Sequence, residues 1–438
     1  MPDFVIDTSV ELPPLRRLNG VNNGPLSCSS LIDVTDYFKI ANIPLVRTHD
    51  TNWPHAREVD IHTLFPDFNK DPSDPASYDF EKTDIYLQSI LNTGASIVYR
   101  LGESIEWTDK KFYVHPPTDF EKWAHICVGV IRHYNQGWAN GFHHNIKYWE
   151  IWNEADIPNV DAMWSGTAAD YFELYATTAR LIKATFPDVF VGGPAAAMRD
   201  LPWVREFLAF CRAGDLPLDF FSWHTYDDDP QVIIDRANLM QEWLEEFGYG
   251  SAESHLNEYN IGAHPIQSPL PMRVSFLRLQ SGEGAAFTAG VLSGLQDTTV
   301  AQGCYYDARA TAWYCGLFDE YGLPRPTYHV FTEFAKMCGF ESRLGVDQTP
   351  DTKGVFPISV AAPEVGIRAW FANSRGEPRK FTIAVPESYK GQSLTYTARL
   401  ISDAAEGAQA TEFDLIDGEL GAEIPRHSVL LIEGVPTR

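Results

Sequence analysis

Residues 146–152 read IKYWEIW, a short and mostly apolar run that is typical of a strand buried in a parallel sheet. A helix-like run follows it and opens with the capping box Thr167-Ala-Ala-Asp170. The same alternation of a β-like run with a helix-like run extends in both directions along the chain. The predicted strands are Leu18–Val21, Ile43–Thr48, Ser96–Leu101, Ile146–Trp152, Val189–Gly192, Phe220–His224, His255–Tyr259 and Gly303–Tyr306.

This alternation predicts an α/β fold, a closed parallel (β/α)8 barrel over residues 18–338. A doubly wound open sheet would also fit, but neither GxGxxG nor GxxxxGK follows any of the strands. After Gly339 the pattern changes to β-rich runs separated by turn residues, which predicts an antiparallel β-sandwich over residues 339–438. A strand around Phe4–Ser9, within residues 1–17, is free to join that sandwich.

Composition narrows the class of ligand. Among 438 residues, 34 are Lys or Arg and 59 are Asp or Glu, giving a formal net charge of −25. Such a field repels nucleic acid and anionic lipid and favours a neutral or cationic ligand. No run of eighteen apolar residues and no secretory signal is present, so we expect a cytoplasmic protein that does not cross a membrane. Nothing in the sequence sets the oligomeric state.

The cysteines do not indicate a metal site. None of the six forms a CxxC pair, and inert core thiols are the simplest interpretation. No cofactor and no metal are predicted. The six are Cys28, Cys127, Cys211, Cys304, Cys315 and Cys338.

Barrel enzymes carry their reacting groups at the C-terminal ends of the strands, and polar residues gather at five of the predicted ends. Two of these residues, Glu154 and Glu258, are carboxylates, and each is preceded by an asparagine. Glycoside hydrolysis needs such a pair, one group to protonate the leaving oxygen and one to attack or to activate water.

The segment Tyr148-Trp-Glu-Ile-Trp-Asn-Glu154 resembles the WNE signature of the retaining (β/α)8 glycoside hydrolase clan. Within that clan the chain is similar to glycoside hydrolase family 39, the β-xylosidase and α-L-iduronidase family. The likeness covers most of residues 18–338. It continues through Phe190-Val-Gly-Gly-Pro194, Asp219-Phe-Phe-Ser-Trp-His-Thr-Tyr226, Asn257-Glu-Tyr-Asn260 and Gly322-Leu-Pro-Arg-Pro326.

The resemblance implies roles for the two glutamates. Glu154, on the fourth strand, would be the general acid/base and hold its proton while Glu258 is ionised. Glu258, on the seventh strand, would be the nucleophile. The carboxyl groups would lie about 5–5.5 Å apart, which gives retention through a glycosyl-enzyme intermediate. Asn153 would bind the 2-hydroxyl of the sugar.

Two positions depart from the family pattern. Family members often have proline directly after the acid/base glutamate, whereas Ala155 and Asp156 follow here. The strand-seven motif is commonly Thr-Glu, and Asn257 replaces that threonine. Neither change touches the catalytic carboxylates, and both are expected to reshape the sugar subsites.

Further residues are candidates for the pocket wall. We expect His224 and Tyr226 to line it, Tyr226 or Tyr306 to donate to the nucleophile, and Arg47 to pair with Glu150 beneath the site. The remaining candidates are His49 and Asp50 for the hydroxyls of the nonreducing sugar, Trp313 for stacking, and Trp53 and Trp107 as weaker stacking candidates.

The predicted substrate is a neutral oligosaccharide or polysaccharide, foremost a β-xyloside or an arabinose-containing plant oligosaccharide. Residues 52–78, rich in proline and aspartate, would wall one end of the cleft and favour exo action. An endo-acting polysaccharide hydrolase of the same family and a catalytically inactive sugar-binding protein remain alternatives. A metal-dependent hydrolase using His49, Asp50, His55, His224 and His264 is disfavoured because the strands carry no His-x-His and HExxH is absent.

Overall fold

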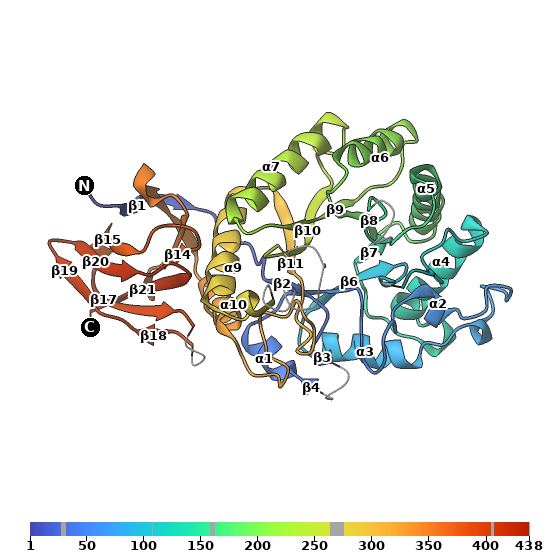
Figure 1. The fold of residues 1–438 in the computed structure, drawn as a ribbon, viewed down its shortest axis with the longest axis horizontal. Helices are drawn as coiled ribbons and strands as arrows, with labels where there is room; N and C mark the ends of the chain where they lie inside the picture. Colours follow the sequence, from blue (N-terminus) through green and yellow to red (C-terminus); the bar gives the residue numbers. More distant parts are fainter. Residues whose placement is uncertain (28–31, 107, 158–162, 263–275, 404–406, 438) are drawn as a thin grey trace.

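The chain folds into a closed barrel beside a separate β-sheet (Figure 1). A computed structural model describes residues 1–27, 32–106, 108–157, 163–262, 276–403 and 407–437. All eight barrel strands pair in parallel, which confirms the predicted barrel. They are β2 (Gly20–Asn22), β5 (Leu45–Thr48), β6 (Ser96–Leu101), β7 (Tyr148–Ile151), β8 (Phe190–Ala196), β9 (Phe220–Tyr226), β10 (Glu253–Asn260) and β11 (Val300–Tyr305).

Amphipathic helices surround the barrel and bury one stripe each. In α4, for example, Trp123, Cys127, Ile131 and Tyr134 repeat at helical spacing and are all buried. The predicted capping box is present in α5, where Asp170 N–H donates to Thr167 Oγ1 at 3.2 Å. The described helices are α1 (Thr35–Ile40), α2 (Ile61–Leu64), α3 (Glu81–Leu91), α4 (Phe120–Gln136), α5 (Ala168–Thr185), α6 (Leu201–Ala213), α7 (Pro230–Glu246), α9 (Gly282–Gly294) and α10 (Pro326–Met337).

Helix α9 joins the two parts of the molecule. Its sequence, GEGAAFTAGVLSG, is small or apolar on every side, which is typical of a helix covered all round. One side packs on the barrel helices α7 and α10, and another packs on the sheet (Figure 1). Trp370 of the sheet donates its indole N–H to Ser293 Oγ of α9 at 2.7 Å. The barrel and the sheet therefore share a buried contact surface.

The second part is one hydrogen-bonded sheet of eleven strands in which nearly every pairing is antiparallel. Its own core includes Phe4, Phe371, Phe381 and Leu430. The strands are β1 (Phe4–Leu12), β12 (Ser342–Gln348), β13 (Val355–Ala362), β14 (Gly366–Asn373), β15 (Arg379–Ala384), β16 (Ser388–Tyr389), β17 (Gln392–Ile401), β18 (Gln409–Ala410), β19 (Phe413–Ile416), β20 (Glu419–Ile424) and β21 (Ser428–Pro436).

The N-terminal strand belongs to this sheet, as Figure 1 shows by the position of the N label. Strand β1 lies between β12, to which it runs antiparallel, and β15, to which it runs parallel. The β1–β15 pairing is parallel, whereas the other described pairings of this sheet are antiparallel. Arg379 fixes it by donating to both carboxylate oxygens of Asp3. The domain boundary between residues 338 and 339 stays a prediction; α10 ends at Met337 and β12 begins at Ser342.

Two further predictions concern the cysteines and membrane-spanning helices. The described cysteines Cys127, Cys211, Cys304, Cys315 and Cys338 are free thiols, and burial raises the pKa of Cys304 to about 12. Cys28 lies outside the described residues. Over the described ranges, no helix combines the length and the apolar character needed to cross a membrane.

Candidate active site

Polar side chains from several strands meet at the C-terminal mouth of the barrel. The centre of this group is Arg47, near the end of β5, whose side chain is fully buried. Its guanidinium donates to Glu150 Oε2 at 2.6 Å, Glu258 Oε1 at 2.7 Å, Asn153 Oδ1 at 2.6 Å and Asn22 Oδ1 at 3.1 Å. The predicted Arg47–Glu150 ion pair is thus present, and Arg47 also contacts Glu258 directly.

The surroundings of Arg47 keep it charged. Burial by itself would lower the pKa of Arg47, but the carboxylates of Glu150 and Glu258 outweigh burial and raise it. A buried guanidinium needs such paired partners because an isolated charge is very costly away from water. The fork geometry of arginine also lets one side chain hold groups from β2, β7 and β10 at fixed positions.

Glu258 lies on β10 and is held at both of its oxygens. Oε1 accepts from Arg47, and Oε2 accepts from the hydroxyl of Tyr226 at 2.7 Å. Burial raises the pKa of Glu258 above its ordinary value, while His224, Arg47 and Tyr226 act in the opposite direction. Burial also raises the pKa of Tyr226, so that its phenol remains a hydrogen-bond donor. The sequence expectation left open whether Tyr226 or Tyr306 contacts this carboxylate, and the structure shows that it is Tyr226.

Glu154 follows β7 on a tight turn. Trp152 and Glu154 have φ of 70° and 50°, in the left-handed region that residues other than glycine seldom adopt. The turn is fixed by the indole N–H of Trp152, which donates to the carbonyl of Met163 at 2.7 Å, and by the N–H of Glu154, which donates to Ala195 at 3.0 Å. Both Asn153 and Glu154 consequently face the same mouth as Glu258.

His224, on β9, lies between the two glutamates. Its Nδ1 is 2.8 Å from Glu154 Oε1 and 3.5 Å from Glu258 Oε2. One oxygen of each carboxylate and a ring nitrogen of His224 all lie within 4.8 Å of one another. Burial lowers the pKa of His224 to about 4, and Arg47 adds to that effect while Glu258 opposes it. The ring is therefore neutral near pH 7, and it is fully buried.

The other predicted residues occupy different parts of the mouth. Asp50 accepts from the N–H of Ile105 at 2.9 Å and from the hydroxyl of Tyr306 at 3.2 Å, so Tyr306 contacts Asp50. His49 is buried next to Asp50, and burial lowers its pKa well below the ordinary value. Trp313 is 62% exposed, as an aromatic platform for a ligand would be. Trp53 packs against the core, while Trp107 and His264 lie outside the described residues.

Three residues of this mouth escaped the sequence reasoning. Asn22 is the last residue of the first barrel strand, β2, and accepts from Arg47, so the same strand-end rule would have found it. Tyr314 packs its ring 5.8 Å from that of Tyr226 and 5.6 Å from that of Tyr306. Arg309 pairs with Asp307 and also donates to the carbonyl of Asp50. No spacing pattern marks Tyr314 or Arg309, because both lie on the loop after β11.

Two groups of side chains have the donor atoms that a metal ion would need. One is the Glu154–His224–Glu258 group, in which Arg47 already supplies positive charge to Glu258. The other comprises Asp60 at the start of helix α2, His62 within that helix, and Glu103 on the loop after β6. There Asp60 already accepts from Arg100 and Ser104, and His62 contacts Glu103. In both groups, donor atoms therefore already contact other side chains of the protein.

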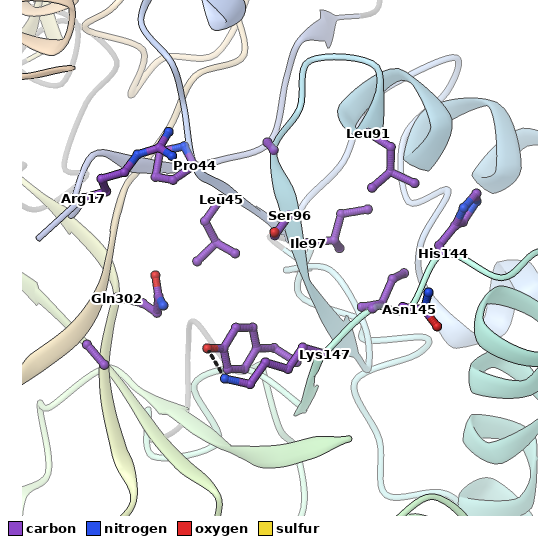
Figure 2. A pocket seen from close by; sticks show the side chains of 14 residues that line it. Arg17, Pro44, Leu45, Leu91, Ser96, Ile97, His144, Asn145, Lys147 and Gln302 are labelled. Atoms are coloured by element: carbon purple, nitrogen blue, oxygen red, sulfur yellow. Dashed lines mark hydrogen bonds between the residues drawn. The ribbon is translucent and has the colours of Figure 1, made fainter. Parts of the chain in front are cut away.

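A cavity of about 420 Å³ lies at the opposite end of the barrel (Figure 2). Its walls include Leu45, Ser96 and Tyr148, each the first residue of its strand, together with Arg17 and Gln302. The Lys147 ammonium donates to the hydroxyl of Tyr148 at 2.8 Å, and a dashed line marks this bond beside Lys147 in Figure 2. In barrel enzymes the chemistry is found at the other end, so this cavity is separate from the site described above.

A model of the glycosyl hydrolases family 39 matches residues 45–247. Over this span the chain is similar to that family. A β-xylosidase of Geobacillus stearothermophilus is 26% identical over 259 residues, covering 50% of this chain and 47% of the relative. A β-xylosidase of Caldicellulosiruptor saccharolyticus is 25% identical over 244 residues, covering 52% of this chain and 48% of the relative. The chain thus matches about half the length of these curated relatives.

Solved structures share the fold of this chain over nearly its whole length. A glucosidase from Croceicoccus marinus superposes with a TM-score of 0.79 at 21% identity, covering 100% of both chains. A monomeric β-xylosidase from Caulobacter crescentus superposes with a TM-score of 0.70 at 16% identity, covering 99% of both chains. The barrel with its attached sheet is therefore an arrangement that other solved proteins have.

Proposed function

We propose that this chain is a retaining glycosidase with Glu258 as nucleophile and Glu154 as general acid/base. One observation carries the proposal: an oxygen of each carboxylate and His224 Nδ1 lie within 4.8 Å of one another. A separation of about 5–5.5 Å between carboxyl groups belongs to double displacement, because an inverting enzyme leaves room for a water between them at about 6.5–9.5 Å. The match of residues 45–247 to the family 39 model supports the same reaction class.

The contacts of each glutamate support its role. Glu258 is 5% exposed and bonded to Arg47 and Tyr226, which suits a carboxylate that must be charged and aimed before it attacks. Glu154 is 15% exposed, which suits a group that exchanges protons first with the leaving group and then with water. The assignment therefore does not rest on the resemblance alone.

In the first step a Glu258 oxygen attacks the anomeric carbon while Glu154 protonates the departing glycosidic oxygen. The bond between sugar and leaving group breaks, and a glycosyl ester forms on Glu258. In the second step Glu154 takes a proton from water, which attacks the same carbon and releases Glu258. Each step inverts the anomeric centre, so the product keeps the configuration of the substrate.

Asn153 supports the transition state in this scheme. Its Oδ1 accepts from Arg47, which fixes the amide so that its Nδ2 end points away from Arg47. An N–H donor there suits the 2-hydroxyl of the sugar, a contact that strengthens as the oxocarbenium-like transition state forms. Asp50 and His49 offer acceptors and donors for other hydroxyls, and Trp313 offers an apolar face.

For the substrate we propose a neutral sugar, foremost a β-xyloside or an arabinose-containing plant oligosaccharide. The two curated relatives named above are β-xylosidases, and the net charge of −25 disfavours a polyanionic chain. Endo action on a polysaccharide is the alternative. Products of several different lengths would reveal it.

The test is hydrolysis of a panel of aryl β-xylosides, α-arabinosides, β-glucosides and plant oligosaccharides. Wild type is compared with Glu154→Gln and Glu258→Gln, and the anomer released first is identified by proton NMR. We expect turnover of a pentoside with retention and a loss of at least about 1,000-fold with Glu258→Gln. Glu242→Gln, exposed on α7, is the matched control and should retain full activity. Release of the inverted anomer, or full activity in either site variant, would refute the proposal.

A further inference from the structure

Two buried polar atoms near the proposed acid lie next to each other in register on neighbouring strands. They are Nε2 of His224, on β9, and Oδ1 of Asn257, on β10, and among the described residues neither has a hydrogen-bond partner at ordinary distance. The strand register pairs Leu256 with Trp223 and Glu258 with His224. Asn257 is therefore the extra residue of a β-bulge, which turns its side chain into the barrel interior.

The orientation of the Asn257 amide is fixed from its other end. Its Nδ2 donates to Oε1 of Glu150, and Oε2 of Glu150 accepts from Arg47. A carboxylate only accepts hydrogen bonds, so the nitrogen of the amide must face Glu150 and the carbonyl oxygen must point the other way. Asn257 also acts on His224 as a hydrogen-bonding side chain that raises the pKa of the ring, as an acceptor does.

We propose that Asn257 is a positioning residue that keeps the ring hydrogen of His224 on Nε2, so that Nδ1 accepts a hydrogen bond from protonated Glu154. The inference rests on the proposed function. It adds the hydrogen-bond arrangement by which the acid keeps its proton before the first step. Neutral imidazole has one donor and one acceptor nitrogen, and the partner of one nitrogen decides what the other can do.

The distances agree with this assignment. Nδ1 of His224 lies 2.8 Å from Glu154 Oε1 and 3.5 Å from Glu258 Oε2, so only the bond to Glu154 has ordinary length. Glu258 does not need the ring as a donor because Arg47 and Tyr226 already donate to it. An acceptor at Nδ1 stabilises protonated Glu154, whereas an Nδ1–H donor would stabilise its ionised form.

Other charged and titratable groups face the same two residues. Glu154 acts on Glu258, Asp156, Tyr226 and Tyr314, and Arg199 on the loop after β8 acts on Tyr314 as well. His224 also faces Arg47, Glu150 and His49. A substitution at Asn257 leaves all of these side chains in the chain. Asn257→Val also removes the donor to Glu150, so a change at Glu154 in that variant is interpreted together with the tautomer of the ring.

The first test reads the tautomer directly and does not depend on activity. Full-length protein with 15N-labelled histidine is studied by NMR at pH 7, and the His224 signals are assigned by their loss in His224→Asn. We expect the hydrogen on Nε2 in wild type and in Asn257→Thr, whose hydroxyl can donate to Glu150 and accept from the ring. In Asn257→Val, which has the same shape without the hydroxyl, we expect the hydrogen on Nδ1.

The second test is the pH profile of kcat/KM for the same pair of variants. Asn257→Val should move the basic limb about one pH unit lower, which is about a tenfold loss on that limb, while Asn257→Thr keeps the wild-type profile. If the valine variant does not fold, Asn257→Ser and Asn257→Ala form the same contrast. A purely structural role would lower the rate equally at every pH.

An Nδ1–H tautomer in wild type, or the same tautomer in wild type and in the valine variant, would overturn the inference. Failure to hydrolyse any glycoside would overturn the proposed function instead, and the NMR result would still decide the tautomer. The two failures are therefore distinguishable.

Discussion

Arg47 Nη1 donates to Glu258 Oε1 at 2.7 Å, between strands that lie three positions apart around the barrel. Both side chains are almost fully buried, and a second carboxylate, Glu150, contacts the same guanidinium. This single cation therefore opposes the burial that raises the pKa of the proposed nucleophile. Among the residues that do not touch the reacting carbon of the sugar, Arg47 is the one whose loss should lower the rate most.

Replacing Arg47 should disable the nucleophile. With Arg47→Lys we expect kcat to fall by about 100-fold, because a lysine cannot reproduce the four bonds of the fork. The acid limb of the pH profile should move to higher pH, since a weaker cation leaves Glu258 harder to ionise. Arg47→Met should in addition destabilise the fold by about 3–5 kcal/mol, because two carboxylates lose their partner. An unchanged kcat in a folded variant would contradict this account.

Tyr226 and Tyr306 form a matched pair of hydroxyls with different partners. Tyr226→Phe removes the 2.7 Å bond to Glu258 and should lower kcat by about 10- to 100-fold, the worth of a hydrogen bond to a charged group. Tyr306→Phe removes the 3.2 Å bond to Asp50 and should act mainly on KM. Steady-state kinetics of both variants on one aryl glycoside test this. Equal effects on kcat would show that the two hydroxyls do not have separate roles.

Added azide should separate the roles of the glutamates. With Glu154→Ala and an activated aryl β-glycoside, azide should capture the glycosyl-enzyme and give the β-glycosyl azide. With Glu258→Ala, azide should take the place of the nucleophile and give the α-glycosyl azide. The products are distinguished by proton NMR, and wild type without azide is the control. The reverse pattern would exchange the two assignments.

The buried histidine makes stability depend on pH. His224 has a pKa of about 4 in the folded chain and about 6.5 when unfolded, so the unfolded state binds a proton first as the pH falls. The contribution of His224 to the free energy of unfolding should therefore be complete above about pH 6.5 and decline as the pH falls toward 4. At pH 5 the loss from this residue is about 2 kcal/mol.

Urea unfolding of wild type and His224→Gln at pH 7.5 and pH 5 tests this prediction. The difference between the two proteins should change by about 2 kcal/mol between these pH values, in favour of the variant at pH 5. Titratable groups that do not contact His224 titrate equally in both proteins, so the comparison removes their share of the pH dependence. A difference that does not change with pH would contradict a neutral, buried His224.

Local sequence was sufficient for the parts of this protein that depend on one segment. Apolar runs such as residues 146–152 predicted the barrel strands, and the Thr167–Asp170 pair predicted the start of α5. The strand-end rule placed His49, Glu154, His224, Tyr226 and Glu258 at one mouth, because parallel strands present their C-terminal ends together.

The tertiary structure alone decided which of these groups contact one another. A regular strand turns Asn257 and Glu258 to opposite faces, and only the bulge in β10 brings both into the barrel interior. Arg47 contacts residues 25, 106 and 211 positions away, so no spacing in the sequence reveals that it holds Asn22, Asn153 and Glu258 together. The place of β1 between β12 and β15 was likewise set by the sheet, because pairing between distant strands is fixed by how their buried faces pack.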